Sequence, residues 1–352
     1  MKRGTTTRIL LVAVAAAGLF AAVPAAACTR CLRVFGDGTA LVARSMDWVE
    51  DPGSEIWVYP RGMSRSGNAG PGSFAWTSRY GSVGVSFYGV ATVDGINEKG
   101  LVANTLYLVE SDYGKSVAGR PNLSIGGWTQ YVLDSYATVA EAVAALEKEP
   151  FTIVAPILPN GEPAVGHLAI SDPSGDSAIF EYIGGRLKIH HGRQYEVMTN
   201  SPPFDEQLVL TSYGGEIGGD VMLPGTIRAS DRFVRASFYI GAIPKNLTGA
   251  RAIASVFSVI RNASAPLGIT TPGKPNVAST IWRTVYDQKD RVLYFDSATS
   301  PTVFHVPLEK VDFTAGAAVK RLPLKGGETY SGDASASFQS AEPFRFLEAK
   351  PQ

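Results

Sequence analysis

The residue that most constrains this chain is Cys28, because the residues before it have the form of an export signal. That signal consists of a basic start with Lys2, Arg3 and Arg8, an apolar run over residues 9–23, and small residues at Ala25 and Ala27. Cleavage after Ala27 would make Cys28 the first residue of a mature protein. A thiol and an α-amine with a pKa of about 8 would then share one Cα, so this residue would carry its own nucleophile and its own base.

Two other interpretations of Cys28 are open. Bacterial lipoproteins are also cut directly before a cysteine that is then acylated, although their signals favour an aliphatic residue such as Leu where this chain has Ala25. Cys31 is the second of the two cysteines, and in an oxidising compartment a Cys28–Cys31 disulfide would block the thiol. A thioredoxin-like role is disfavoured, because such C-x-x-C pairs begin a helix, whereas this pair leads into the strand-like residues 32–35.

Composition excludes several classes of protein. Removal of residues 1–27 leaves 325 residues, enough to bury a large core. The mature chain would have 29 basic and 32 acidic side chains, which does not indicate a nucleic acid or an anionic membrane as a partner. No later apolar run approaches the roughly 20 residues of a membrane-spanning helix, so we expect a soluble protein in the periplasm or outside the cell. Neither a repeat nor a linker divides the chain, which predicts one domain over residues 28–352.

The start of the mature chain predicts a β-hairpin. Apolar alternation over residues 28–35 is followed by a Gly-Asp-Gly turn and a returning strand over residues 39–44. A hairpin of this length brings its far end back to its first residue. We therefore expect Arg44 and Asp47 to lie near Cys28 from local geometry alone.

The remaining pattern consists of groups of strands separated by pairs of helices. Strands are expected over residues 55–59, 82–88, 90–93, 101–108, 151–155, 165–171, 177–182, 186–190, 195–199, 279–287, 291–297 and 302–307. Helices are expected over residues 124–136, 138–149, 230–240 and 249–262, the first capped by Ser124 and the second by a Thr138/Glu141 capping box. This grouping predicts the α+β class with antiparallel sheets, and a polar surface extension over residues 326–340. The histidines, His167, His190, His191 and His305, lack the spacing of zinc ligands and are interpreted as structural.

Five short stretches have an order and spacing that are specific as a set. They are Cys28-Thr29, Arg44-Ser45-Met46-Asp47, Asn97-Glu98-Lys99-Gly100-Leu101, Thr199-Asn200-Ser201-Pro202, and Leu223-Pro224-Gly225 with Ser230-Asp231-Arg232-Phe233. Together they resemble the choloylglycine hydrolase and penicillin V acylase family of linear-amide hydrolases, most closely its Gram-negative penicillin V acylase branch. The resemblance implies a four-layer αββα sandwich of the N-terminal-nucleophile hydrolases, a small-molecule amide substrate, no metal or organic cofactor, and a homotetramer.

The resemblance also implies roles for residues of the hairpin. Cys28 would attack the amide carbonyl and form a thioester that water then hydrolyses. Arg44 would stabilise the thiolate, and Asp47 would accept a hydrogen bond from the amino group of the cysteine. The alternatives, a surface arginine at a strand end and a turn-forming aspartate, are disfavoured by the hairpin geometry.

Asn200 and Arg232 complete the implied site. Asn200 would point its side-chain amide at the developing oxyanion, helped by the backbone N–H of Tyr107. Arg232 would be a second active-site arginine. By themselves, Asn200 would serve equally well as a turn residue, and Arg232 as one half of an exposed ion pair with Asp231.

Aromatic residues beside the nucleophile bear on the substrate. Tyr107 occupies a position where bile-salt hydrolases tend to have Asn and penicillin V acylases an aromatic residue, and Trp48 directly follows Asp47. Two such rings suit a phenoxyacetyl group or an apolar slot for a fatty acyl chain, unless both are core aromatics. We therefore expect hydrolysis of penicillin V, of N-acyl-homoserine lactones, or of both. The alternatives are a conjugated bile acid hydrolase and a non-catalytic exported lipoprotein with an acylated Cys28.

Overall fold

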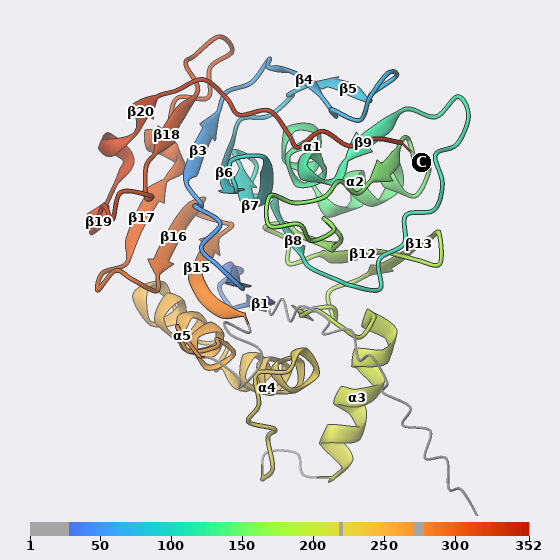
Figure 1. Cartoon of the computed structure of the whole chain (residues 1–352). Helices are drawn as coiled ribbons and strands as arrows, with labels where there is room; N and C mark the ends of the chain where they lie inside the picture. Colours follow the sequence, from blue (N-terminus) through green and yellow to red (C-terminus); the bar gives the residue numbers. More distant parts are fainter. Residues whose placement is uncertain (1–27, 218–220, 270–277, 352) are drawn as a thin grey trace, which may run out of the picture.

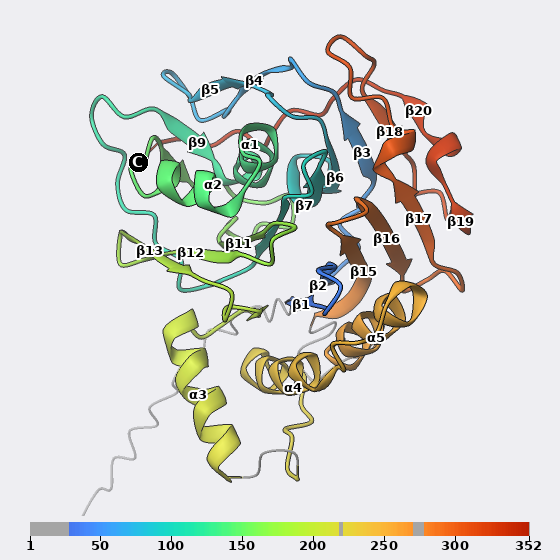
Figure 2. The same ribbon diagram turned by 180° about the vertical axis from the view of Figure 1, so that it is seen from behind.

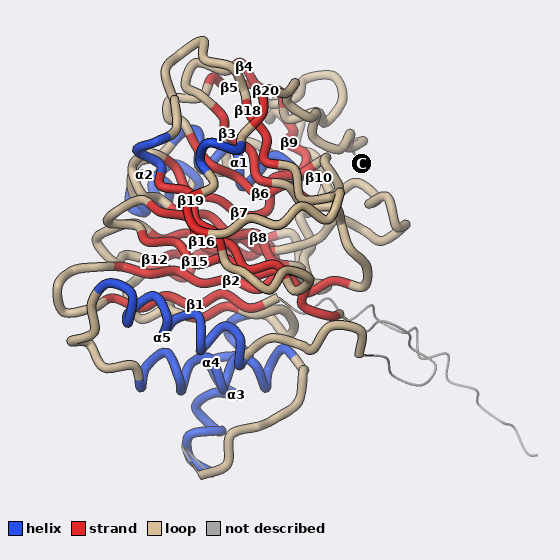
Figure 3. The backbone as a smooth tube through the Cα atoms, turned by 90° about the vertical axis from the view of Figure 1, so that its left-hand side faces the viewer, coloured by secondary structure: helices blue, strands red, loops and turns tan. Residues whose placement is uncertain are grey.

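The computed structural model describes residues 28–217, 221–269 and 278–351, which form two large sheets packed face to face with helices on both outer sides (Figure 1). The order of layers is helices, sheet, sheet, helices, and the strands of the two sheets lie between the helical layers in Figure 3. This confirms the α+β class that the strand and helix pattern predicts and the four-layer arrangement that the resemblance implies. The expected signal segment, residues 1–27, lies outside the described residues.

The first sheet contains the strand that follows Cys28. Its strands, in spatial order, are β14 (Val197–Met198), β1 (Thr29–Val34), β2 (Ala40–Trp48), β15 (Ser279–Asp287), β16 (Val292–Ser297), β17 (Phe304–Pro307) and β19 (Gly332–Asp333). All neighbours pair antiparallel except β17 and β19. β2 is buried along its whole length, because one face meets the second sheet and the other meets helix α5.

The second sheet is larger and also mainly antiparallel. Its strands, in spatial order, are β13 (Arg186–His191), β12 (Ser177–Ile183), β11 (His167–Ser171), β8 (Val102–Leu106), β7 (Ala91–Asn97), β6 (Ser82–Phe87), β3 (Ile56–Tyr59), β18 (Lys320–Leu322) and β20 (Gln339–Ser340). Two small ladders lie outside it, β4 (Ser64–Ser66) with β5 (Ala75–Thr77) and β9 (Asn122–Ser124) with β10 (Thr152–Val154).

Helices cover the outer face of each sheet (Figures 1 and 2). α4 (Ala229–Ala242) and α5 (Gly249–Asn262) pack on the first sheet, and α1 (Trp128–Ser135) and α2 (Val139–Leu146) on the second. Short 3-10 turns occur at Ile125–Gly127, Leu308–Lys310 and Ser335–Ser337. α3 (Phe204–Ile217) packs against α4 and leaves most of its apolar side chains exposed. Within the described ranges, no helix has the length and apolar character needed to cross a bilayer.

Several elements confirm the expectations from sequence. β1 and β2 form the predicted hairpin, with Arg30 opposite Arg44. The Thr138 hydroxyl accepts a hydrogen bond from the backbone N–H of Glu141 at 3.2 Å, which begins α2 as a capping residue does. α5 and β15 have the predicted bounds.

Other elements differ from the expectations. Ser124 occupies the N-cap position of the 3-10 turn Ile125–Gly127 but makes no capping hydrogen bond, because its hydroxyl donates to the carbonyl of Leu347 at 2.7 Å. α1 begins only at Trp128. β7 continues through Asn97 and does not end at residue 93 as predicted, since Asp94 is held inside the molecule by a hydrogen bond from Thr284 at 2.7 Å. α3, β4, β5, β9 and β18 are absent from the predicted pattern, because the apolar residues of α3 follow no helical period and each of these strands has only three residues. β19, β20 and one 3-10 turn lie in the expected surface extension.

Gly100 connects the two sheets at the turn between β7 and β8. Its φ angle is 85°, in the left-handed region that favours glycine. Its carbonyl accepts a hydrogen bond from the side chain of Gln288, after β15, at 2.9 Å. A Cβ at position 100 would overlap the main-chain oxygen of Gln288.

We expect Gly100→Ala to lower the free energy of unfolding by about 3 kcal/mol, from the strained φ together with the overlap. Gly38→Ala is the matched control, because Gly38 has a φ of 81° and nothing within 4 Å of its ideal Cβ. That variant should lose only about 1 kcal/mol. Urea denaturation measures both losses, and equal losses would show that the contact with Gln288 is unimportant.

Candidate active site

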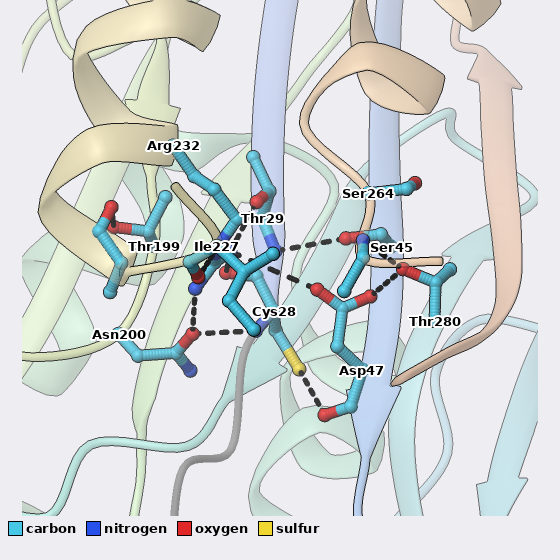
Figure 4. A network of polar contacts seen from close by, with 12 residues as sticks. Cys28, Thr29, Ser45, Asp47, Thr199, Asn200, Ile227, Arg232, Ser264 and Thr280 are labelled. Atoms are coloured by element: carbon cyan, nitrogen blue, oxygen red, sulfur yellow. Dashed lines mark hydrogen bonds and ion pairs between the residues drawn. The ribbon is translucent and has the colours of Figure 1, made fainter. Parts of the chain in front are cut away.

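Cys28 lies directly before β1, where pairing of the hairpin places β2 beside it (Figure 4). Arg44 Nη2 lies 3.9 Å from Cys28 Sγ, and the Cys28 thiol donates to the main-chain carbonyl of Asp47 at 3.7 Å. All three residues are buried. The hairpin therefore brings Arg44 and Asp47 to Cys28, as its length requires.

Arg44 and Asp47 point to opposite faces of the first sheet, because they are three positions apart on β2. Arg44 points between the sheets, where Nη2 donates to the carbonyl of Thr105 at 3.2 Å and Nη1 lies 3.9 Å from the carboxylate of Asp94. Asp47 points toward the helices, and its Oδ1 accepts a hydrogen bond from Thr280 at 2.5 Å. The end of β1 thus has a charged side chain on each side of the sheet.

Arg232 extends from α4 to the same end of β1 (Figure 4). Its Nη1 donates to the carbonyl of Cys28 at 2.6 Å and to the hydroxyl of Thr29. Its Nη2 donates to Asn200 Oδ1 at 2.9 Å, and Nη1 lies 3.9 Å from Asp47 Oδ2. Arg232 is fully buried, so the alternative of an exposed ion pair is wrong.

Asn200 joins three segments of the chain. Its Oδ1 accepts from the nitrogen of Cys28 at 2.5 Å and from Arg232, and its Nδ2 donates to the carbonyl of Tyr107 at 2.7 Å. The resemblance implied instead that the Cys28 nitrogen bonds to Asp47 and that the Asn200 amide points at an oxyanion. In a chain that retains residue 27, the Cys28 nitrogen is a peptide nitrogen with one hydrogen to donate.

Burial and charge act in opposite directions on the sulfur of Cys28. Burial raises the pKa of the Cys28 thiol, the positive charges of Arg44 and Arg232 lower it, and the negative charge of Asp47 raises it. Burial also raises the pKa of Asp47 to about 6, against the nearby charge of Arg232. An ionised sulfur at this depth therefore depends on the two arginines.

Cys28 borders an apolar cavity beside β2, β7 and β8. The cavity encloses about 590 Å³, open space at its mouth included. Its aromatic lining consists of Trp48, Phe87 and Tyr107. The rings of Trp48 and Tyr107 meet edge to face, with centroids 5.5 Å apart. Trp48 is buried and Tyr107 half-buried, so both expected substrate-binding residues are packed in the core and also line the cavity.

Two residues outside the expected site hold the segment before Asn200. His167 is buried, with Nδ1 2.8 Å from Glu181 and Nε2 2.7 Å from the carbonyl of Thr199. Gln207, on α3, accepts from the Thr199 hydroxyl at 2.6 Å and donates to the carbonyl of Asn200. His167 is therefore structural, as expected, but no spacing in the sequence links it to Thr199.

No cluster suited to a metal ion occurs in the part of the chain that the structure describes, where no three or more His, Cys, Asp or Glu side chains are suitably grouped.

Cys31 lies three positions after Cys28, and both thiols are free and buried. Residues three positions apart in a strand are about 10 Å apart and point to opposite faces. A disulfide needs Cα atoms within about 7 Å. The Cys28–Cys31 disulfide that the sequence left open is therefore incompatible with β1 as it stands.

We expect Cys31 to be unreactive in the folded protein, because burial raises the pKa of its thiol to about 12. In the Cys28→Ala variant, Ellman's reagent should label nothing under native conditions and one thiol per chain in denaturant. Rapid labelling of the native variant would contradict this burial. In the wild type, two free thiols should appear in denaturant without reductant, and none would indicate a disulfide.

Comparison with known proteins gives the family. Residues 28–319 match the linear amide C-N hydrolases, choloylglycine hydrolase family. The chain is 49% identical over 329 residues to a penicillin V acylase from Pectobacterium atrosepticum, which covers 87% of this chain and 88% of the relative. It is 23% identical over 292 residues to a bile salt hydrolase/transferase from Bifidobacterium longum, which covers 76% of this chain and 90% of the relative.

Solved structures agree with this assignment. A penicillin V acylase from Agrobacterium tumefaciens superposes with a TM-score of 0.85 at 56% identity, covering 91% of this chain and 99% of that one. A mutant conjugated bile acid hydrolase from Clostridium perfringens has the same fold, with a TM-score of 0.72 at 22% identity over 87% of this chain and 98% of that one. The expected N-terminal-nucleophile hydrolase sandwich is thus confirmed. With the family matched from Cys28 onward, this chain belongs to the linear amide C-N hydrolases of the choloylglycine hydrolase family and is an amidohydrolase.

Proposed function

We propose that this protein is an exported N-terminal cysteine hydrolase that cleaves the side-chain amide of penicillin V. The observation that carries the proposal is the position of Cys28, whose sulfur contacts the buried Arg44 and borders an apolar cavity. An acyl group in that cavity would present its carbonyl carbon to the sulfur. Activation would consist of removing residues 1–27 during export to the periplasm or the exterior. The family match that begins at residue 28 supports this cut.

The cut before Cys28 would change the hydrogen bonds of its nitrogen. A free α-amine has more hydrogens than a peptide nitrogen, so it can keep Asn200 as an acceptor and also engage Asp47. Asp47 Oδ2 is buried and has no hydrogen-bond partner among the described residues, which supports this role. The amine would take the proton of the thiol, and Arg44 would stabilise the resulting thiolate.

The reaction would then proceed in two steps. The sulfur of Cys28 bonds to the amide carbon, and the oxyanion that forms takes the Asn200 amide away from the carbonyl of Tyr107. The α-amine passes its proton to the departing nitrogen as the C–N bond breaks, which leaves a thioester. Water attacks the thioester and gives a proton to the amine, and the C–S bond breaks so that the acid leaves. The amine returns its proton to the Cys28 sulfur, which restores the free thiol.

Identity and the cavity lining support penicillin V as the substrate. Relatives named penicillin V acylase are 49% and 56% identical to this chain, whereas relatives named bile salt hydrolase/transferase are 23% and 27% identical. Trp48 and Tyr107 would contact a phenoxyacetyl ring. N-acyl-homoserine lactones are the second candidate, because the aliphatic remainder of the lining suits a fatty acyl chain. Conjugated bile acids are the less well supported alternative.

We also propose assembly into a homotetramer. Exposed apolar side chains on α3 support an interface between copies there, namely Leu208, Val209, Leu210, Tyr213 and Ile217. Light scattering of the purified protein measures the assembly directly.

We expect Cys28→Ala to fold but to lose activity on penicillin V by about 10⁴-fold or more, because the nucleophile and its proton acceptor act as a unit. Cys31→Ala is the control, since it removes the other thiol and should keep wild-type turnover. Release of the free amine from penicillin V measures both. Turnover by Cys28→Ala at the wild-type rate would rule out the proposed mechanism.

The intact mass of the exported protein should correspond to a chain that begins with an unmodified Cys28. A mass increased by that of an acyl lipid would favour a lipoprotein instead.

We expect Trp48→Ala to raise KM for penicillin V about tenfold with a smaller change in kcat, because the ring would contact the acyl group. Trp57→Ala is the matched control, since Trp57 is also buried but packs in a separate cluster with Tyr59. That variant should lose stability and keep the wild-type KM. The same assays on dodecanoyl-homoserine lactone and glycocholate rank the candidate substrates. An unchanged KM in Trp48→Ala would remove Trp48 from the site.

A further inference from the structure

A segment near the end of the chain contributes to the wall of the cavity that Cys28 borders. We name residues 344–349 the C-terminal strap. It runs past α1 and β9 toward the end of the chain marked in Figure 1, and Leu347 from this strap lines the cavity. The match to the family stops at residue 319, so the strap lies outside the part of the chain that the family description covers.

Hydrogen bonds fix the backbone of the strap on both sides of its central residue. The N–H of Leu347 donates to the carbonyl of Val90 at 2.8 Å, and its carbonyl accepts from the hydroxyl of Ser124 at 2.7 Å. Asn68 Nδ2 donates to the carbonyl of Phe346 at 2.6 Å, and the N–H of Ala349 donates to the carbonyl of Asn68 at 2.9 Å. The backbone is therefore held independently of the Leu347 side chain.

Side chains on either side of Leu347 also anchor the strap. Phe346 is buried and stacks on Trp76, with ring centroids 6.1 Å apart. Its ring packs so closely on Gly127 that a Cβ there would lie 3.1 Å from it. Ala349 is fully buried in a small apolar cluster. Replacing Leu347 should therefore leave the strap in place.

Arg44 and Thr105 also line the cavity, but its lining residues beside Leu347 are apolar. Val90 and Ala91 at the start of β7, and Ile125 and Gly126 before α1, line the same cavity. Gly126 is tightly enclosed, since a Cβ there would lie 3.0 Å from the carbonyl of Val90. A wall without polar side chains discriminates between ligands by size and shape rather than by hydrogen bonds. Leu347 is only partly buried, so part of its surface is free to contact a ligand.

We propose that Leu347 is a specificity-determining residue that limits the size of the acyl group accepted beside Cys28. This inference rests on the proposed function, because it treats the cavity as the acyl site. Shortening Leu347 enlarges the cavity and favours long acyl chains, and an aromatic ring at this position shortens the cavity and disfavours them.

The test compares butanoyl-, octanoyl- and dodecanoyl-homoserine lactone, which share one leaving group. Leu347→Ala should raise the ratio of kcat/KM for dodecanoyl over butanoyl substrate by about tenfold, and Leu347→Phe should lower it. Glu348→Ala is the matched control, because Glu348 is the exposed neighbour on the same strap, and its ratio should equal that of the wild type. Thermal unfolding confirms that each variant is folded.

A ratio that stays unchanged in both Leu347 variants, with unfolding temperatures near that of the wild type, would overturn the proposal. If wild type turns over none of the lactones, the proposed lactone activity fails, and a second measurement still tests Leu347. Rates of Cys28 alkylation by N-butyl- and N-dodecylmaleimide should then show the same dependence on position 347. Equal alkylation ratios in wild type and both variants would overturn the role of Leu347 separately from the proposed function.

Discussion

The rest of the site depends on the hydrogen bonds and charge contact made by the guanidinium of Arg232. It donates to the carbonyl of Cys28 and the side chain of Asn200, and it faces Asp47. Its Nε also donates to the carbonyl of Ile227 at 3.0 Å. A buried guanidinium is destabilising when its charge is left without partners. The position of α4 on the first sheet is therefore coupled to the geometry around the sulfur, because a shift of α4 would leave a buried charge unpaired.

The buried carboxylate of Asp47 lowers the stability of the folded protein. Burial raises the pKa of its carboxyl from an ordinary value near 3.8 to about 6. Between those values the folded chain binds more protons than the unfolded chain, so the contribution of Asp47 to stability falls as the pH rises through this window. Above it, the ionised carboxylate remains inside the protein, held by Thr280 and near Arg232. The two-sheet core must offset that unfavourable contribution.

The sequence predicts correctly those elements and contacts that depend on local residue pattern and on residues close together in the chain. The hairpin alone accounts for Arg44 and Asp47 beside Cys28, and one apolar face accounts for α5. Asn200 and Arg232 reach Cys28 across 172 and 204 positions, and only the resemblance indicated them. Their hydrogen bonds were not predictable, because each side chain has several acceptors or donors within reach. α3 and the C-terminal strap were missed because their apolar residues follow no regular period, and tertiary contacts decide their structure.

The C-terminal strap has a consequence for how the molecule matures. Cys28 and Leu347 border one cavity although nearly the whole chain lies between them. A nascent chain, or one threaded unfolded through a membrane, lacks that part of the wall even after β1 and β2 have paired. The wall of this cavity is thus completed only when the last-made residues dock, whereas β1 and β2 can pair as soon as the first residues have folded.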